Sequence, residues 1–133
     1  MVAAGTVVSL HRWPVKSLAG EPVDALRIDA RGAGGDRAQA LFGIFGGERR
    51  RLTVRQVPRM LKWSAAYPQA PGADLDPDAP PLPVVTAPDG RTFTWDDPAL
   101  PGALRENDKS DKRIAIRPLA GSAGQTPFPD GRP

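Results

Sequence analysis

The chain has 133 residues, enough for one domain with a modest core, and its 16 prolines and 14 glycines indicate many turns. Lysine and arginine (18) slightly outnumber aspartate and glutamate (15), so the net charge is +3, which suits an anionic ligand. Without cysteine and with a single histidine, the chain excludes disulfides, thiolate nucleophiles and Cys- or His-cluster metal sites. No apolar run reaches the roughly 18 residues of a membrane span, so we expect a soluble, cytoplasmic domain.

The N-terminal part of the chain alternates strand patterns with glycine-rich turns. Residues 6–13 mix β-branched and apolar side chains and end at Pro14, which predicts a first strand. Residues 23–29 alternate with a period of two and predict a half-buried second strand. Residues 31–37 are rich in glycine, so we expect a loop with unusual backbone angles that leads into a third strand over residues 38–45.

The middle of the chain predicts a hairpin, a further strand and a long loop. A turn at residues 46–48 connects the third strand to a short strand over residues 52–54. Residues 60–67 predict the next strand. Prolines crowd residues 68–83, and because proline donates no hydrogen bond to a sheet, this segment predicts an extended surface loop.

The C-terminal part contains the clearest turn in the sequence. Asp89-Gly90 lies between two β-rich runs and predicts a hairpin, and Asp97 followed by Pro98 predicts the start of a short helix. Residues 113–117 alternate and predict the last strand. Together these patterns predict a mainly β fold, a small antiparallel β-barrel with one short helix at most.

Three short clusters place cations beside proline or glycine turns. The first is residues 13–17 (Trp-Pro-Val-Lys-Ser), the second is residues 35–37 (Gly-Asp-Arg), and the third is residues 53–58 (Thr-Val-Arg-Gln-Val-Pro). Each cluster opens or follows a predicted strand. They therefore lie where loops can present side chains to a ligand.

The side chains of these clusters suit phosphate. Lys16 and Ser17 offer an ammonium group and a hydroxyl beside a proline turn. Arg37 and Arg55 add guanidinium groups, each able to donate two parallel hydrogen bonds to one anion. The alternative is that each cation is a solvated charge at a strand end, as most surface cations are. The residues alone leave both interpretations open.

The order and spacing of the three clusters resemble the N-terminal domain of the MOSC (molybdenum cofactor sulfurase C-terminal domain) proteins, which include the mitochondrial amidoxime reducing component. The resemblance covers residues 5–67 well and extends more loosely to residue 117. Trp13 stands where tyrosine is common in the family, and Gln39 where an aromatic residue is usual. Neither is a phosphate ligand in the family, and three motifs in register are more specific than any one of them.

The resemblance implies that this domain binds part of a molybdenum cofactor, molybdopterin. In the family, the lysine and serine of the first motif and the arginine of the second hold the phosphate end. This assigns cofactor binding to Lys16, Ser17 and Arg37. Arg55 is either a further phosphate ligand or a brace for its own loop through backbone carbonyls. The family's molybdenum ligand is a cysteine of the MOSC domain, so we expect no metal ligand and no catalytic residue in this chain.

The resemblance also implies a partner domain. We expect residues 1–119 to form the MOSC N-terminal β-barrel domain and residues 120–133 to be a tail or the start of a linker to a missing MOSC domain. That C-terminal MOSC domain, in cis or in trans, is the expected partner, and an electron-transfer protein is a further candidate. The parent protein is then a molybdenum-dependent oxidoreductase or a sulfur carrier, and the chain is not an enzyme on its own.

Two other functions stay open from the residues. One is a stand-alone, non-catalytic binding or structural β-barrel without a cofactor. The other is a nucleic-acid-binding barrel that uses Arg49, Arg50 and Arg51, although the sequence lacks the interleaved aromatics of a base-stacking platform. We expect the three arginines to be a solvated hairpin edge, and we expect no nucleic-acid and no membrane partner.

Overall fold

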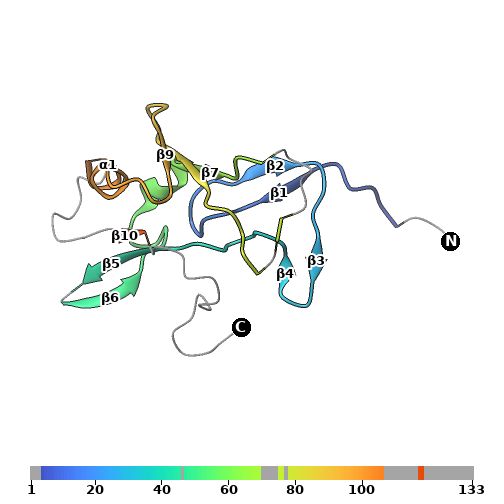
Figure 1. The fold of residues 1–133 in the computed structure, drawn as a ribbon, viewed down its shortest axis with the longest axis horizontal. Helices are drawn as coiled ribbons and strands as arrows, with labels where there is room; N and C mark the ends of the chain where they lie inside the picture. The colour runs from blue at the N-terminus through green and yellow to red at the C-terminus, as the bar shows by residue number, and fades with distance from the viewer. Residues whose placement is uncertain (1–3, 46, 70–74, 77, 107–116, 119–133) are drawn as a thin grey trace.

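A computed structural model describes residues 4–45, 47–69, 75–76, 78–106 and 117–118. Over these residues the fold consists of short strands, one 3-10 helix and one α-helix (Figure 1). The elements are β1 Leu10–Arg12, β2 Glu21–Val23, β3 Ile28–Asp29, β4 Gly32–Ala33, β5 Leu41–Phe45, β6 Glu48–Arg51, η1 Pro58–Lys62, β7 Ser64–Ala66, β8 Val84–Thr86, β9 Thr92–Thr94, α1 Leu100–Glu106 and β10 Arg117–Pro118. The prediction of a mainly β fold with one short α-helix is confirmed.

The described strands pair into four small sheets. Their orders are β1-β2, β3-β4, β10-β5-β6 and β7-β8-β9, and every pairing is antiparallel. Two isolated parallel bridges, Val15 to Gln39 and Ala19 to Ser64, connect the segment after β1 to the chain just before β5 and to β7. The antiparallel part of the prediction is therefore confirmed, and the described residues show several small linked sheets in place of one closed barrel sheet.

The N-terminal strands are shorter than predicted. β1 begins at Leu10, so residues 6–9 lie outside any strand. The predicted strand over residues 23–29 is wrong as a single element, because β2 ends at Val23 and β3 begins only at Ile28. Alternation indicates which face a side chain takes, but a strand also needs a hydrogen-bonding neighbour. β1 supplies none beyond Leu10, which lies opposite Val23.

The hairpin of β5 and β6 is confirmed, but its second strand starts earlier than predicted. The register pairs Phe45 with Glu48, and Gly47 takes a φ of 83°, a left-handed conformation that glycine adopts without strain. The tight turn starts β6 at Glu48, so the predicted strand over residues 52–54 is wrong. In the described sheet β6 is an edge strand, where three consecutive arginines discourage further strand pairing.

The predicted strand over residues 60–67 is wrong in its first half. Pro58 begins the 3-10 helix η1, where its missing N–H leaves no hydrogen bond unmade, and β7 starts only at Ser64. Met60 and Trp63 are both buried at 2% exposure. Their spacing of three residues is one turn of a 3-10 helix, so both side chains face the core from the same side.

The C-terminal hairpin and a short helix are confirmed, but the helix begins two residues after the predicted first position, Pro98. β8 and β9 pair across the Asp89-Gly90 turn, in which Gly90 has a φ of 91°. The helix α1 begins at Leu100, and Asp97 Oδ1 accepts a hydrogen bond from Ala99 N–H (2.8 Å) just before it. Of the helices described, none has the length and apolar character needed to cross a membrane.

Some predicted segments are described only in part. The described residues of the proline-rich segment 68–83 form no helix and no strand, in line with the predicted loop. From the predicted last strand only Arg117 is described, in β10, which pairs with β5. Residues 113–116 and the predicted tail 120–133 lie outside the described residues.

One hydrophobic core connects these elements. It draws on η1, α1, the sheet of β7 to β9, the start of β5 and the segment after β1. Its largest fully buried side chains include Trp63, Trp95, Leu18, Leu41, Leu52 and Leu100. Val15 and Leu18 belong to this core, whereas Lys16 and Ser17 between them are only half-buried, so the core anchors the first motif on both sides of these two residues.

Candidate functional site

The first two sequence motifs lie side by side, joined by their backbones. Four hydrogen bonds connect residues 13–16 with residues 36–39. They are Trp13 N–H to Asp36 Oδ1 (2.8 Å), Arg37 N–H to Trp13 O (2.5 Å), Gln39 N–H to Pro14 O (3.1 Å) and Lys16 N–H to Gln39 O (3.0 Å). The structure thus brings the loop that contains Lys16 and Ser17 against the loop that contains Arg37.

Two of the predicted ligands have an unusual backbone conformation. Ser17 has a φ of 72° and Arg37 a φ of 48°, and among the described residues no other non-glycine residue has a positive φ. A side chain in this left-handed region costs about 1 kcal/mol or more, so the surrounding structure must hold it there. Such strained residues gather at ligand sites.

The three predicted phosphate ligands are accessible. Lys16 and Ser17 are half-buried, and the side chain of Arg37 is 65% exposed. Arg37 Nη1 lies 3.4 Å from Asp36 Oδ2, a long and exposed ion pair that holds the guanidinium only weakly. The Asp36 carboxylate is better engaged through its other oxygen, which accepts from Trp13 N–H. Arg37 therefore has a backbone that is fixed against the first motif and an exposed guanidinium that is only weakly paired.

The third motif forms a separate turn that braces itself. Gln56 Oε1 accepts hydrogen bonds from Thr53 N–H (3.0 Å) and from Thr53 Oγ1–H (2.6 Å), and Thr53 Oγ1 accepts from Arg55 N–H (3.3 Å). The Arg55 side chain is exposed. Thr53 and Gln56 thus provide the bracing that the sequence analysis offered as one role for Arg55.

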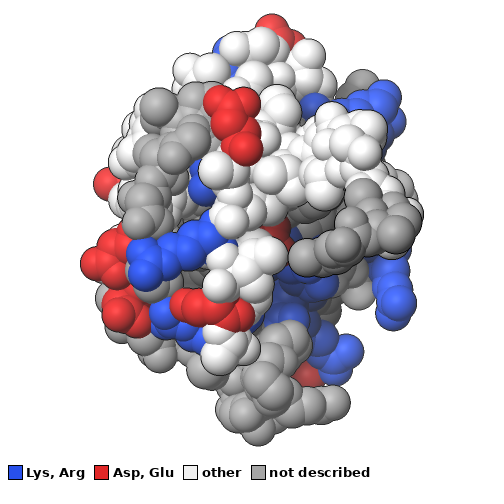
Figure 2. All heavy atoms as spheres, turned by 90° about the vertical axis from the view of Figure 1, so that its right-hand side faces the viewer, with Lys and Arg blue, Asp and Glu red and all other residues white. Residues whose placement is uncertain are grey.

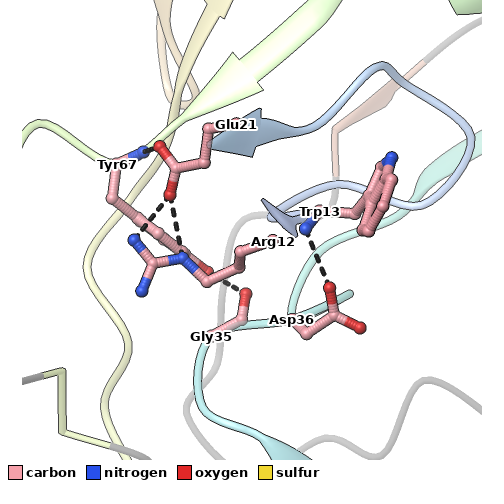
Figure 3. Close-up of polar contacts among 6 residues, drawn as sticks. All are labelled: Arg12, Trp13, Glu21, Gly35, Asp36 and Tyr67. Carbon is pink, nitrogen blue, oxygen red and sulfur yellow. Dashed lines mark hydrogen bonds and ion pairs between the residues drawn. The ribbon is translucent and has the colours of Figure 1, made fainter. Parts of the chain in front are cut away.

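Behind the first two motifs lies a buried polar network that the sequence analysis missed (Figure 3). The Arg12 side chain is 4% exposed and donates to Glu21 Oε1 from Nε (2.8 Å) and from Nη2 (2.5 Å). The other carboxylate oxygen of Glu21 accepts from Tyr67 N–H (3.0 Å). The Arg12 guanidinium also lies 4.8 Å from the centre of the Tyr67 ring, within reach of a cation–π contact.

This network ends on the second motif. Tyr67 Oη–H donates a hydrogen bond of 2.6 Å to Gly35 O, the first residue of the Gly-Asp-Arg segment. Gly35 has a φ of 78°, and a Cβ there would lie 2.9 Å from Tyr67 Cε2 and 3.0 Å from Leu75 Cδ1. Only glycine therefore fits between the tyrosine and the turn.

The polar network has a weak sequence signature. In β1, Arg12 lies two residues after Leu10 and so shares its inward face, where a charged side chain requires a partner. Figure 3 shows Arg12 pointing toward Glu21 and Tyr67 while Trp13 projects to the other side of the strand. The inward arginine could have been noticed, but the identity of its partners depends on the β1-β2 register and on the position of the chain after β7.

Because Tyr67 is buried, we expect its hydroxyl to lose its proton at a higher pH than that of a solvent-exposed tyrosine. Desolvation is the main cause that raises the pKa of its hydroxyl, Glu21 and Asp36 add to the rise, and Arg12 opposes it. The folded protein then keeps a proton that the unfolded chain loses near pH 10. The stability from this group is therefore complete below about pH 10 and declines as the pH rises toward the higher folded pKa.

Tyr67 is the only tyrosine in the chain, so its phenolate absorbance near 295 nm reports this one group. We expect that absorbance to appear together with the loss of far-UV circular dichroism, well above pH 10. A phenolate that forms near pH 10 with the fold intact would show that the hydroxyl is solvated.

The arginines of β6 engage their own hairpin. Arg49 lies over the ring of Phe42 at 4.5 Å, and Arg50 pairs with Glu48 at 2.7 Å. Figure 2 shows, on one face of the molecule, acidic side chains beside basic ones. These contacts favour the solvated hairpin edge over a single basic stripe of the kind that nucleic-acid-binding modules present.

No group of three or more His, Cys, Asp or Glu side chains that could hold a metal ion occurs in the described part of the chain. Comparison with curated proteins and with solved structures finds no match. The family model of the MOSC N-terminal beta barrel domain matches residues 4–117, which include all three motifs and the buried network behind them. The chain therefore belongs to the MOSC N-terminal β-barrel domain family.

Proposed function

We propose that this domain is an accessory domain of a molybdenum-cofactor-binding MOSC protein. Lys16, Ser17 and Arg37 bind the phosphate end of the cofactor, and a C-terminal MOSC domain, in cis or in trans, holds the metal. The observation that carries this proposal is the set of backbone hydrogen bonds that join the first two motifs. They bring together two cationic loops from distant parts of the chain.

The chemistry of these residues fits a phosphate group. Lys16 contributes an ammonium group with three donors, Ser17 a hydroxyl, and Arg37 a planar fork that donates two parallel hydrogen bonds. A phosphate dianion accepts several such bonds and favours positive charge nearby. Lys16 and Ser17 are half-buried and Arg37 is exposed, so all three side chains are accessible to an anion from solvent.

The same residues do not fit the metal. The chain contains no cysteine, and molybdenum in this family takes a protein thiolate. When bound, the cofactor supplies redox or sulfur-transfer chemistry at its metal, in a parent protein that is an oxidoreductase or a sulfur carrier with a suitable electron-transfer partner. The residues of this domain bind and orient the phosphate end only, so we assign them no proton transfer and no bond cleavage.

Alanine variants test the phosphate site. The wild-type chain is expected to bind inorganic phosphate weakly, with a Kd of about 1 mM, because few charge-assisted bonds offset the cost of association. Lys16→Ala and Arg37→Ala should each weaken this binding about tenfold or more, since each removes a hydrogen bond to a charged group. Isothermal titration calorimetry at two salt concentrations measures both affinities.

The matched control is the double variant Arg49→Ala/Arg50→Ala, which removes two exposed cations of β6. It should bind phosphate as the wild type does. A titration of the same proteins with a labelled oligonucleotide tests the nucleic-acid alternative. That alternative predicts micromolar binding that weakens with salt and is lost only in the Arg49→Ala/Arg50→Ala variant. Phosphate binding that survives in both Lys16→Ala and Arg37→Ala would contradict the proposed site.

Arg55 is a separate candidate within this proposal, because its motif forms its own turn. Arg55→Ala in the same phosphate titration tests it. A loss comparable to that of Arg37→Ala would add Arg55 to the site. An unchanged affinity would restrict the site to the first two motifs.

A further inference from the structure

The Gly-Asp-Arg segment is held from two directions by groups outside the proposed ligand set. Toward the core, Gly35 O accepts the hydrogen bond from the Tyr67 hydroxyl (2.6 Å). Toward the first motif, Asp36 Oδ1 accepts from Trp13 N–H (2.8 Å), and Arg37 N–H donates to Trp13 O (2.5 Å). With both preceding residues held, Arg37 is kept at its left-handed φ of 48°.

The Tyr67 hydroxyl can hold this segment because Tyr67 is itself held. The residue is 4% exposed, its ring lies against the Arg12 guanidinium, and its backbone N–H donates to Glu21 Oε2 (3.0 Å). Arg12 is in turn fixed by two hydrogen bonds to Glu21. Arg12 is also the neighbour of Trp13 in the chain, so the network and the first motif share one piece of backbone (Figure 3).

We infer that Tyr67, backed by Arg12 and Glu21, is a positioning residue for Arg37 and sets the affinity of the anion site. The inference rests on the proposed function for the identity of the ligand. It adds that the buried network holds the Arg37 backbone at the left-handed φ from which its side chain reaches the anion. The network contacts no ligand itself and acts through Gly35 and the Arg37 backbone.

Tyr67→Phe tests the inference, because phenylalanine keeps the ring, its packing and the contact with Arg12 while it removes the hydrogen bond to Gly35. We expect the Kd for inorganic phosphate to rise about three- to tenfold, the equivalent of one hydrogen bond. We also expect amide hydrogen exchange of Arg37, measured by NMR on the folded chain, to accelerate by a similar factor. The exchange rates of Val85 and Phe93, in the sheet of β7 to β9, should change much less.

Val85→Ala is the control for loss of stability. Val85 is fully buried in β8, so its truncation lowers stability without touching the network. If the network positions Arg37, Val85→Ala should leave the phosphate Kd at its wild-type value. It should also leave the amide exchange rate of Arg37, compared with that of neighbouring residues, unchanged. Tyr67→Phe should change both quantities. Equal effects of the two variants on the Kd would overturn the inference, since Tyr67 would then matter only for stability.

The two readouts also separate the inference from the proposed function. Unchanged Arg37 exchange in Tyr67→Phe overturns the positioning role, whatever the wild-type affinity for phosphate. If the wild type binds no phosphate at tens of millimolar, the proposed function fails, and the exchange of Arg37 alone decides whether Tyr67 holds the segment.

Discussion

Glu21→Ala is expected to lower the free energy of unfolding by about 3–5 kcal/mol, because it leaves a buried guanidinium without its carboxylate. Arg12 is 3% exposed, and the two donor atoms that face Glu21 cannot turn to water without opening the β1-β2 pair. The same substitution removes the acceptor for Tyr67 N–H. Urea denaturation followed by far-UV circular dichroism measures the change.

Glu48→Ala is the matched control for removal of a carboxylate. Its ion pair with Arg50 has a similarly short separation of 2.7 Å, but both side chains are about two-thirds exposed, at 66% and 69%. A solvated pair of this kind contributes about 0–1 kcal/mol. If Glu21→Ala proves as mild as Glu48→Ala, Arg12 is solvated in solution and the buried network is not formed as described.

Trp63→Ala should destabilise the domain by about 3–5 kcal/mol, the usual range for removing a large buried aromatic side chain. Trp63 is 2% exposed, and its ring centre lies 6.3 Å from that of Phe93 across the core. Its backbone carbonyl accepts from Ala19 N–H (2.8 Å), and because the substitution keeps this carbonyl, the expected loss comes from the side chain. Because the chain has three tryptophans, circular dichroism is the clearer probe of unfolding than fluorescence.

Leu61→Ala supplies the comparison within the same 3-10 helix. Leu61 is 57% exposed, and a substitution at such a position usually changes stability by less than about 0.5 kcal/mol. A strand over residues 60–67 would instead place Leu61 and Trp63 on the same face, because strand side chains alternate with a period of two. Large losses of similar size for both variants would therefore contradict the assignment of η1 and favour the predicted strand.

Local turn chemistry made part of the fold predictable. Asp89-Gly90 correctly predicted the β8-β9 hairpin, and Asp97-Pro98 correctly predicted a short helix, although α1 begins two residues after Pro98, because both signals depend on residues close in sequence. The strand predicted over residues 60–67 is wrong in its first half, because the 3-10 helix that Pro58 begins runs to Lys62. The strand over residues 23–29 was wrong because pairing depends on a neighbour that alternation does not reveal.

The motifs of the candidate site could be found in the sequence, but the buried polar network behind them could not. The family resemblance of three short clusters assigned Lys16, Ser17 and Arg37 to the site, and the structure joins the loops that contain them. The partners of Arg12 were not predictable, because Glu21 lies across a strand pair and Tyr67 follows the distant strand β7. The left-handed conformations of Ser17 and Arg37 likewise result from tertiary contacts, since serine and arginine have no intrinsic preference for positive φ.

The most direct test of the phosphate site is an NMR titration of the isotope-labelled chain with inorganic phosphate at constant ionic strength. The proposal predicts a saturable set of amide shifts confined to residues 13–17 and 35–39, the two segments that the backbone hydrogen bonds join. Arg37→Ala should abolish this set while the rest of the spectrum stays that of the folded protein. Shifts that centre on β6, or that grow linearly without saturation at every exposed cation, would contradict a specific phosphate site at Lys16, Ser17 and Arg37.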